Sequence, residues 1–305
     1  MLRRIFDLPA ALGLCFLLAQ SEAIGQTTSS TPALAPAQSN PGLLKSLVGL
    51  YESWRKAVSS KDLAAWEQVT ALSRQVAIRN RIVSEKAPFP RAFFEDPVQA
   101  PPLGGLVPLG CFSRGETATA IYFGKADFGL DVDSSQITEN LIVLEFIKDE
   151  GIWKFDKLRV VKIGTDGEVL LKIRNQDFSF LKGEEFQPPL APPPVPQLVS
   201  QPDYIAELWI TAIGYEVEVR VNGNLSAKIA NNSGKELVIG GLRRGQNSIE
   251  IKSTALASLK GKSRPKVEVA IYAQFAKDNI RRVYHYLPGK EVDPVEKANF
   301  SATAD

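Results

Sequence analysis

A proline-rich segment divides the chain into two parts. Residues 187–201 (QPPLAPPPVPQLVSQ) contain six prolines within 188–196. Proline fixes φ and lacks a backbone N–H, so such a run favours extended polyproline II over a helix or a central strand. We therefore expect a semi-rigid linker here, between a first domain at 42–186 and a second at 202–287. A docking motif for a proline-recognising partner is the alternative interpretation.

The N-terminus has the pattern of an export signal. Two arginines precede twelve apolar residues at 8–19, a run too short to span a bilayer as a helix. Ser21 and Ala23 supply the small residues that signal peptidase requires. We therefore predict a signal peptide at 1–23, a flexible leader at 24–41, and a periplasmic or extracellular protein with no membrane span after cleavage. An uncleaved anchor and a lipoprotein are the alternatives.

Composition excludes several kinds of chemistry. The 305 residues include one histidine and two cysteines, and the net charge is +2. Once the signal peptide is removed, Cys111 is the remaining cysteine, so no intramolecular disulfide is possible. The sequence also lacks phosphate-binding glycine motifs and nucleophile motifs. We expect no metal, no cofactor and no nucleic-acid partner, and we favour a binding role over an enzymatic one.

The first domain is predicted to be α+β. Apolar residues at helical spacing predict a first helix, a Ser59-x-x-Asp62 box starts a second, and a third piece extends to about Glu85. The pattern then changes to strands, with a tight turn at 149–151. The expected strands are 106–113, 116–124, 141–149, 151–163 and 168–174. This order favours helices packed on one face of an antiparallel sheet.

The second domain is predicted to be all-β. Apolar and polar residues alternate over 215–221 and over 267–275, and Asn222-Gly223 is typical of a hairpin turn. About seven short strands indicate a β-sandwich. The tail, 288–305, is polar and acidic and is expected to be frayed.

Both domains resemble known families. The first resembles the NTF2-like superfamily in LVGLYESWRKAVSSKDLAAW (47–66), ETATAIYFG (116–124) and LIVLEFIKDEGIWKFDKLRVVKI (141–163). That resemblance implies a cone, in which a curved sheet wraps N-terminal helices, and homodimers paired through the sheets. The second resembles galactose-binding-like or jelly-roll domains in VEVRVNGNLSAK (217–228) and LRRGQNSIEIKS (242–253). An immunoglobulin-like sandwich would explain the same pattern.

Candidate catalytic groups are few. The NTF2-like resemblance implies an acidic base and a tyrosine in some members, for which Tyr122 and Asp127 are weak candidates. Asp131-x-Asp133 begins like a calcium loop but lacks the glycine and the glutamate that such a loop requires, so we expect a solvated loop. Cys111 has apolar neighbours and is expected to be a buried, inert thiol.

Candidate binding residues lie in the second domain, which has an excess of basic residues. Exposed aromatic rings could stack on sugars, and arginines could contact an anionic surface. The predicted ligand-binding residues are Tyr272, Tyr284, Tyr286, Arg243, Arg244, Arg281 and Arg282. Tyr272 falls on the strand face that a sandwich leaves wet.

These patterns favour an exported, non-enzymatic binding or assembly protein of the cell envelope. The sandwich would recognise an envelope glycan or an anionic surface, and the cone would serve dimerisation or hold a small ligand. Two alternatives stay open. One is an isomerase- or hydrolase-like enzyme acting in the cone on a small apolar or carbonyl substrate. The other is a tethered subunit of an envelope or secretion complex.

Overall fold

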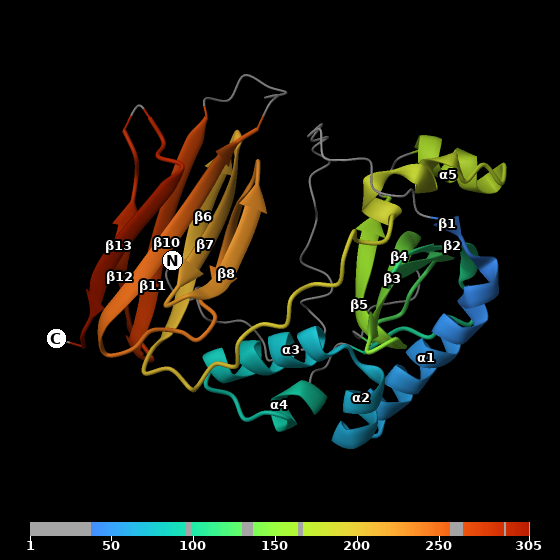
Figure 1. Ribbon diagram of the computed structural model, residues 1–305, viewed down its shortest axis with the longest axis horizontal. Helices are drawn as coiled ribbons and strands as arrows, with labels where there is room; N and C mark the ends of the chain where they lie inside the picture. Colours follow the sequence, from blue (N-terminus) through green and yellow to red (C-terminus); the bar gives the residue numbers. More distant parts are fainter. Residues whose placement is uncertain are drawn as a thin grey trace. The chain divides into compact units, whose positions relative to one another are not determined.

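The structure, a computed structural model, describes residues 38–95, 99–129, 137–163, 167–256, 265–289 and 291–304. The chain divides into two compact units (Figure 1). Of the described residues, unit 1 contains those within 38–78 and 90–195, and unit 2 contains those within 79–89 and 196–304. The fold is mixed, with helices and three antiparallel sheets. None of the described helices has the length and apolar character needed to cross a membrane.

Unit 1 is built on a five-stranded antiparallel sheet whose strands follow one another in chain order. They are β1 (Gln38–Ser39), β2 (Val107–Arg114), β3 (Thr117–Gly124), β4 (Asn140–Asp149) and β5 (Ile152–Lys162). The predicted tight turn between β4 and β5 is confirmed. Glu150 and Gly151 both have positive φ, at 50° and 81°, as a two-residue hairpin turn of this kind requires.

Side-chain hydrogen bonds cap the N-termini of the first two helices. The helices of unit 1 are α1 (Pro41–Ser59), α2 (Leu63–Val69), α4 (Arg91–Phe94) and α5 (Gly167–Arg174), and α3 (Leu72–Ser84) has residues in both units. Asn40 caps α1 by accepting a hydrogen bond from the N–H of Leu43. Asp62 caps α2 through the N–H of Ala65. The predicted helix start before Leu63 is confirmed, but Ser59 is not its cap, because Ser59 ends α1 and bonds back to a carbonyl of that helix.

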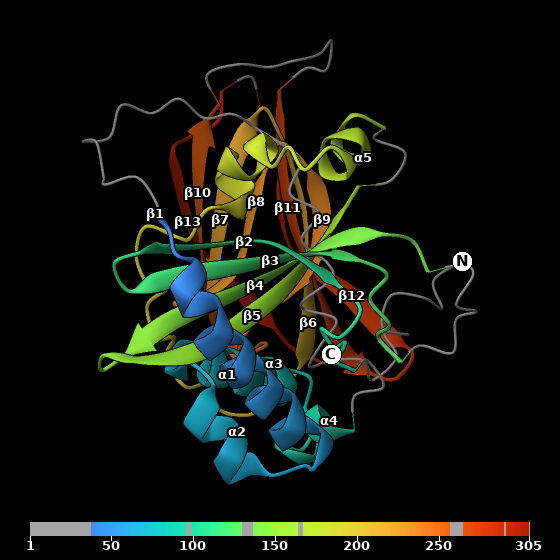
Figure 2. The same ribbon diagram turned by 90° about the vertical axis from the view of Figure 1, so that its right-hand side faces the viewer.

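The apolar face predicted for α1 is confirmed. Figure 2 shows α1 lying across the strands of the sheet. Leu47, Tyr51 and Trp54 are buried on its inner side, and the centroid of the Phe155 ring lies 4.5 Å from that of Trp54 and 5.4 Å from that of Tyr51. Burying each of these large side chains contributes roughly 1.5–3 kcal/mol. Phe146 of β4 packs edge-on against Phe155, so aromatic rings fill the layer between α1 and the sheet.

Helical segments cover the other sheet face as well, which corrects two predictions. Residues 168–174 form helix α5 instead of a strand, and helices are therefore not confined to one face of the sheet. Two short 3-10 segments follow, η2 (Ser179–Lys182) and η3 (Glu184–Phe186). Val169, Leu170 and Ile173 pack from α5 against a core that includes Ile121 and Val143 of the sheet. A helical period, and not strand alternation, brings these three side chains to one side.

Unit 2 contains two four-stranded antiparallel sheets, in the orders β13-β10-β7-β8 and β12-β11-β6-β9. The strands are β6 (Ile205–Ile213), β7 (Tyr215–Val221), β8 (Asn224–Ala230), β9 (Ser233–Leu237), β10 (Gly245–Ala255), β11 (Lys266–Ala276), β12 (Asn279–Tyr286) and β13 (Val295–Ala302). Both sheets contribute alternate side chains to one core. The hairpin turn at Asn222-Gly223 is confirmed, since both residues have positive φ.

The C-terminal tail is not frayed as predicted. Residues 295–302 form β13, which pairs along its whole length with β10. Phe300 and Ala302 are buried in the core of unit 2, and Ala298 packs against it. The short apolar alternation Ala298, Phe300, Ala302 therefore outweighs the polar composition of the tail.

The end of the proline-rich segment is fixed within unit 2 by the second half of α3. Asn80, which is 2% exposed, donates a hydrogen bond to the carbonyl of Gln197 at 2.7 Å and accepts one from the N–H of Val199 at 3.0 Å. Arg79 donates to the carbonyl of Val199 at 3.1 Å. The buried hydroxyl of Ser84 accepts from the N–H of Gly240 at 2.7 Å. These contacts place residues 79–89 with unit 2, although the sequence assigns them to the first domain.

Candidate functional site

The outer face of the sheet β12-β11-β6-β9 carries the most distinctive group of side chains in unit 2. Strand alternation turns Leu208 and Ile210 of β6 into the core and leaves Trp209 on the other face. On β11 the same rule buries Ile271 and places Tyr272 outward. Because Ala270 of β11 pairs directly with Trp209, there is room above the small alanine for the two large rings to meet.

The two rings form a fixed aromatic pair. The centroids of Trp209 and Tyr272 are 4.6 Å apart, with an interplanar angle of 38°. The Nζ atom of Lys235, on the neighbouring strand β9, lies 3.8 Å from the centroid of the Trp209 ring. The indole N–H donates to the carboxylate of Glu207. Trp209 is thus held by a cation, a carboxylate and a second ring, which restricts its rotamer freedom before any ligand binds.

A hollow of about 380 Å³ lies over this pair, within the size range of small-ligand sites. Its lining combines aromatic surface with hydroxyl, amine, guanidinium and carboxylate groups. The residues that line it are Trp209, Ile210, Thr211, Ser233, Gly234, Lys235, Glu268, Ala270, Tyr272 and Arg282. Such a lining offers both hydrogen-bond donors and acceptors beside an apolar ring.

Two carboxylates of this face have opposite electrostatic settings. Hydrogen bonds from Lys266 and then His285 lower the pKa of Glu268, whose carboxylate oxygens lie 2.6 Å from Lys266 Nζ and 3.0 Å from His285 Nε2. Burial raises the pKa of Glu207, and its hydrogen bond from Trp209 and the charge of Lys235 act in the opposite direction. The bonds from Lys266 and His285 thus favour the charged, hydrogen-bond-accepting form of Glu268, while Glu207 orients the indole.

The structure brings two of the seven predicted binding residues into this hollow, Tyr272 and Arg282. Tyr284 and Tyr286 instead pack from β12 against the core, and the ring of Tyr284 lies 5.4 Å from that of Phe300. Burial raises the pKa of Tyr284 to about 12.

The three other predicted arginines do not line the hollow. Arg281 lies over the ring of Phe275 and donates to the carbonyl of Thr303. Arg243 and Arg244 are exposed at the turn before β10.

The sequence pointed to Trp209 only as one of several aromatic rings available to stack on sugars, and it gave no reason to select Lys235 or Glu268 as binding residues. The alternation of β6 could have identified Trp209, because its neighbours at 208 and 210 are the apolar residues. Lys235 could not be identified from its neighbours in sequence, because its position beside Trp209 depends on the pairing of β9 with β6.

The two predicted catalytic residues, Tyr122 and Asp127, do not form a catalytic site together. Tyr122 is buried at the end of β3, and this burial raises its pKa. Asp127 is exposed and accepts a hydrogen bond from the N–H of Gly129 in a local turn. Cys111 is buried as predicted, and burial raises its pKa to about 11. Asp131 and Asp133 lie outside the described residues.

Within the part of the chain that the structure describes, no three His, Cys, Asp or Glu side chains are grouped so as to hold a metal ion. No family model matches the chain, and no curated protein or solved structure is found to be similar to it.

Proposed function

We propose that the protein binds a saccharide of the cell envelope through the outer face of sheet β12-β11-β6-β9. In this proposal it is an exported, non-enzymatic binding protein, and unit 2 is a β-sandwich of the galactose-binding-like or jelly-roll kind. The Trp209–Tyr272 pair is the single observation that carries the proposal, because two large rings lie in contact with each other outside the core. Sugar rings present apolar C–H faces that stack on such surfaces, and their hydroxyls need the donors and acceptors found around the pair.

The charge of the face favours a neutral saccharide over a polyanion. Lys235, Arg282 and Lys266 supply positive charge there, and Glu207 and Glu268 offset most of it. The ammonium group of Lys235 already makes a cation–π contact with the ring of Trp209, and Lys266 forms an ion pair with Glu268. A polyanion would gain little at such a balanced surface, whereas a hydroxyl-rich ligand can use both signs.

For unit 1 we propose the NTF2-like architecture, with a role in dimerisation or in holding a small ligand. The N-terminal helix α1 on an antiparallel sheet supports this assignment. The rings of Tyr51, Trp54 and Phe155 pack closely between α1 and the sheet, so a ligand of this unit would bind outside that layer.

The proposal is tested by calorimetric titration of the full chain with cellohexaose, laminarihexaose, mannohexaose and chitohexaose, and with polygalacturonate as a polyanion. We expect one or more neutral hexasaccharides to bind, and Trp209→Ala and Tyr272→Ala each to weaken binding roughly tenfold, or about 1.4 kcal/mol. The matched control is Trp153→Ala, because Trp153 is a half-buried indole of unit 1 that also lies beneath a lysine, Lys148. Binding of polygalacturonate alone, or no binding up to about 10 mM, would overturn the proposal.

A further inference from the structure

We propose a second binding site, in unit 1, for a small monocarboxylate that carries an apolar group. It lies between the last two turns of α1, the short helix α4 and residues 99–100. This site is separate from the saccharide face and does not depend on it.

A hollow of about 470 Å³ occupies this place, and its lining divides into two kinds of surface. Arg55, Lys56 and Lys61 supply positive charge, and Glu52 offsets part of it. The apolar part is made by Phe93, Phe94 and Val58. A cationic rim beside an aromatic wall favours a ligand with one negative charge and an apolar body.

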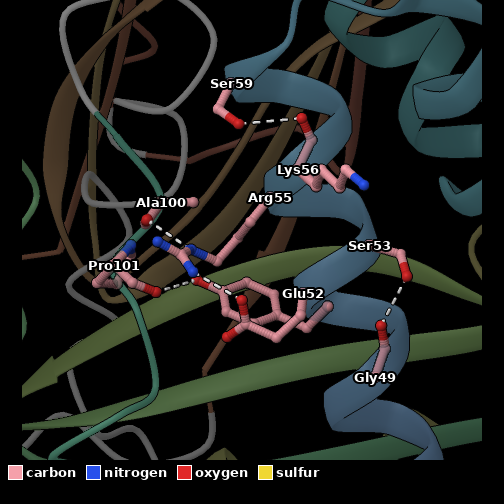
Figure 3. Close-up of polar contacts among 9 residues, drawn as sticks. Gly49, Glu52, Ser53, Arg55, Lys56, Ser59, Ala100 and Pro101 are labelled. Atoms are coloured by element: carbon pink, nitrogen blue, oxygen red, sulfur yellow. Dashed lines mark hydrogen bonds and ion pairs between the residues drawn. The ribbon is translucent and has the colours of Figure 1, made fainter.

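The guanidinium of Arg55 is held in place before any ligand arrives (Figure 3). Its Nε donates to the carbonyl of Ala100 at 3.0 Å, and its Nη1 donates to Glu52 Oε2 at 2.7 Å. The buried hydroxyl of Tyr51 donates to the next carbonyl along the chain, that of Pro101, at 2.8 Å. Two side chains of α1 therefore hold the 100–101 backbone, and the Arg55 guanidinium is positioned by its hydrogen bonds to Ala100 and Glu52.

Arg55 keeps hydrogen-bonding capacity for a ligand. A guanidinium has five N–H donors, and Ala100 and Glu52 account for two of them. No described residue accepts a hydrogen bond from the remaining three. The planar donor fork matches the geometry of a carboxylate, and the neighbouring Glu52 carboxylate disfavours a ligand with two negative charges.

The aromatic wall is supported from behind. Phe93 is 2% exposed, and its ring centroid lies 4.9 Å from that of Trp66 in α2. The ring of Phe94 lies 5.0 Å from that of Phe93 and is only partly buried, so it is the aromatic side chain available to an apolar ligand group. Substituting Phe94 therefore tests the apolar half of the site with little change to the core.

The test compares 4-phenylbutyrate with 4-phenylbutanamide, which has the same apolar body without the charge. Both are titrated into the full chain by calorimetry at low ionic strength. We expect the carboxylate to bind at least tenfold more tightly than the amide. Equal binding of the two compounds, or no binding of the carboxylate up to about 10 mM, would overturn the proposal.

Matched variants locate the site. Lys56→Gln and Lys61→Gln should each weaken binding of the carboxylate about three- to tenfold, and Phe94→Ser should weaken it by a similar factor. The control is Lys45→Gln, since Lys45 is an exposed lysine near the other end of α1, away from the hollow. If Lys45→Gln weakens binding as much as Lys56→Gln and Lys61→Gln do, the effect is general surface charge and the proposed site is wrong.

Discussion

Asn80→Ala should destabilise unit 2, because this side chain joins α3 to the end of the proline-rich segment. The substitution leaves the buried N–H of Val199 without its acceptor, which costs roughly 1–3 kcal/mol. It also removes the bond to the carbonyl of Gln197, worth about 1 kcal/mol, although water can replace Asn80 at that exposed residue. We expect the free energy of unfolding of unit 2 to fall by about 2–4 kcal/mol.

The assay is urea unfolding of the full chain, followed by tryptophan fluorescence and by far-ultraviolet circular dichroism. Ser84→Ala should give a smaller loss, about 1–2 kcal/mol, because it removes the acceptor for Gly240 N–H. Ser53→Ala is the matched control. Like the hydroxyl of Ser84, which donates to the carbonyl of Asn80, its hydroxyl donates to the carbonyl four residues earlier in its helix. Ser53 is exposed, however, so little change is expected. A loss below about 0.5 kcal/mol for Asn80→Ala would refute the reasoning, since leaving a buried N–H without its acceptor lowers the free energy of unfolding by more than this.

Three further predictions follow from burial in the two units. Burial raises the pKa of Glu85 to about 7 in the folded protein, from an ordinary value near 4.5, so the folded state binds more protons between these values. Stability should therefore fall as pH rises from about 4.5 to 7, and Glu85→Gln should reduce this slope in unfolding curves taken across that range. A part of the same sign should remain from carboxyl groups such as Glu236 and Glu207, whose pKa burial also raises. An unchanged slope would contradict the assignment to Glu85. The thiol of Cys111, whose pKa burial raises to about 11, should react with a disulfide reagent at pH 8 only when the protein is unfolded, and rapid labelling of the native protein would show that the thiol is accessible. Phe300→Ala should lower the stability of unit 2 by about 3–5 kcal/mol in urea unfolding, and a loss near zero would show that β13 is dispensable for the core.

Local patterns were enough to predict most of the helices and strands. The apolar spacing of α1, the turn at Glu150-Gly151 and the turn at Asn222-Gly223 depend on neighbours in sequence, and each is found where it was predicted. The segment 168–174 was ambiguous, because a short run with Val, Leu and Ile satisfies a strand pattern as well as a helical one. Packing against Ile121 and Val143 decides for the helix, and that contact is not visible locally.

Long-range pairing explains what the sequence could not predict. β13 is short and polar, and its place depends on the partner strand β10. The contact of Asn80 with residues 197 and 199 spans more than one hundred positions and joins two segments with no shared pattern. In the candidate site, alternation could place Tyr272 on an outer face, but the pairing of β6 with β11 and β9 is needed to bring Trp209 and Lys235 to it.

The most direct test of saccharide binding follows the four indole N–H signals of the full chain by two-dimensional NMR during titration with the neutral hexasaccharides. Trp54 and Trp66 are buried in unit 1, and Trp153 lies on β5. We predict that the Trp209 signal, assigned by its loss in Trp209→Phe, shifts with a saturable dependence on saccharide while the other three stay in place. A saccharide that binds and shifts the Trp153 signal, or leaves the Trp209 signal unmoved, would contradict the proposal that the outer face of sheet β12-β11-β6-β9 is the recognition surface.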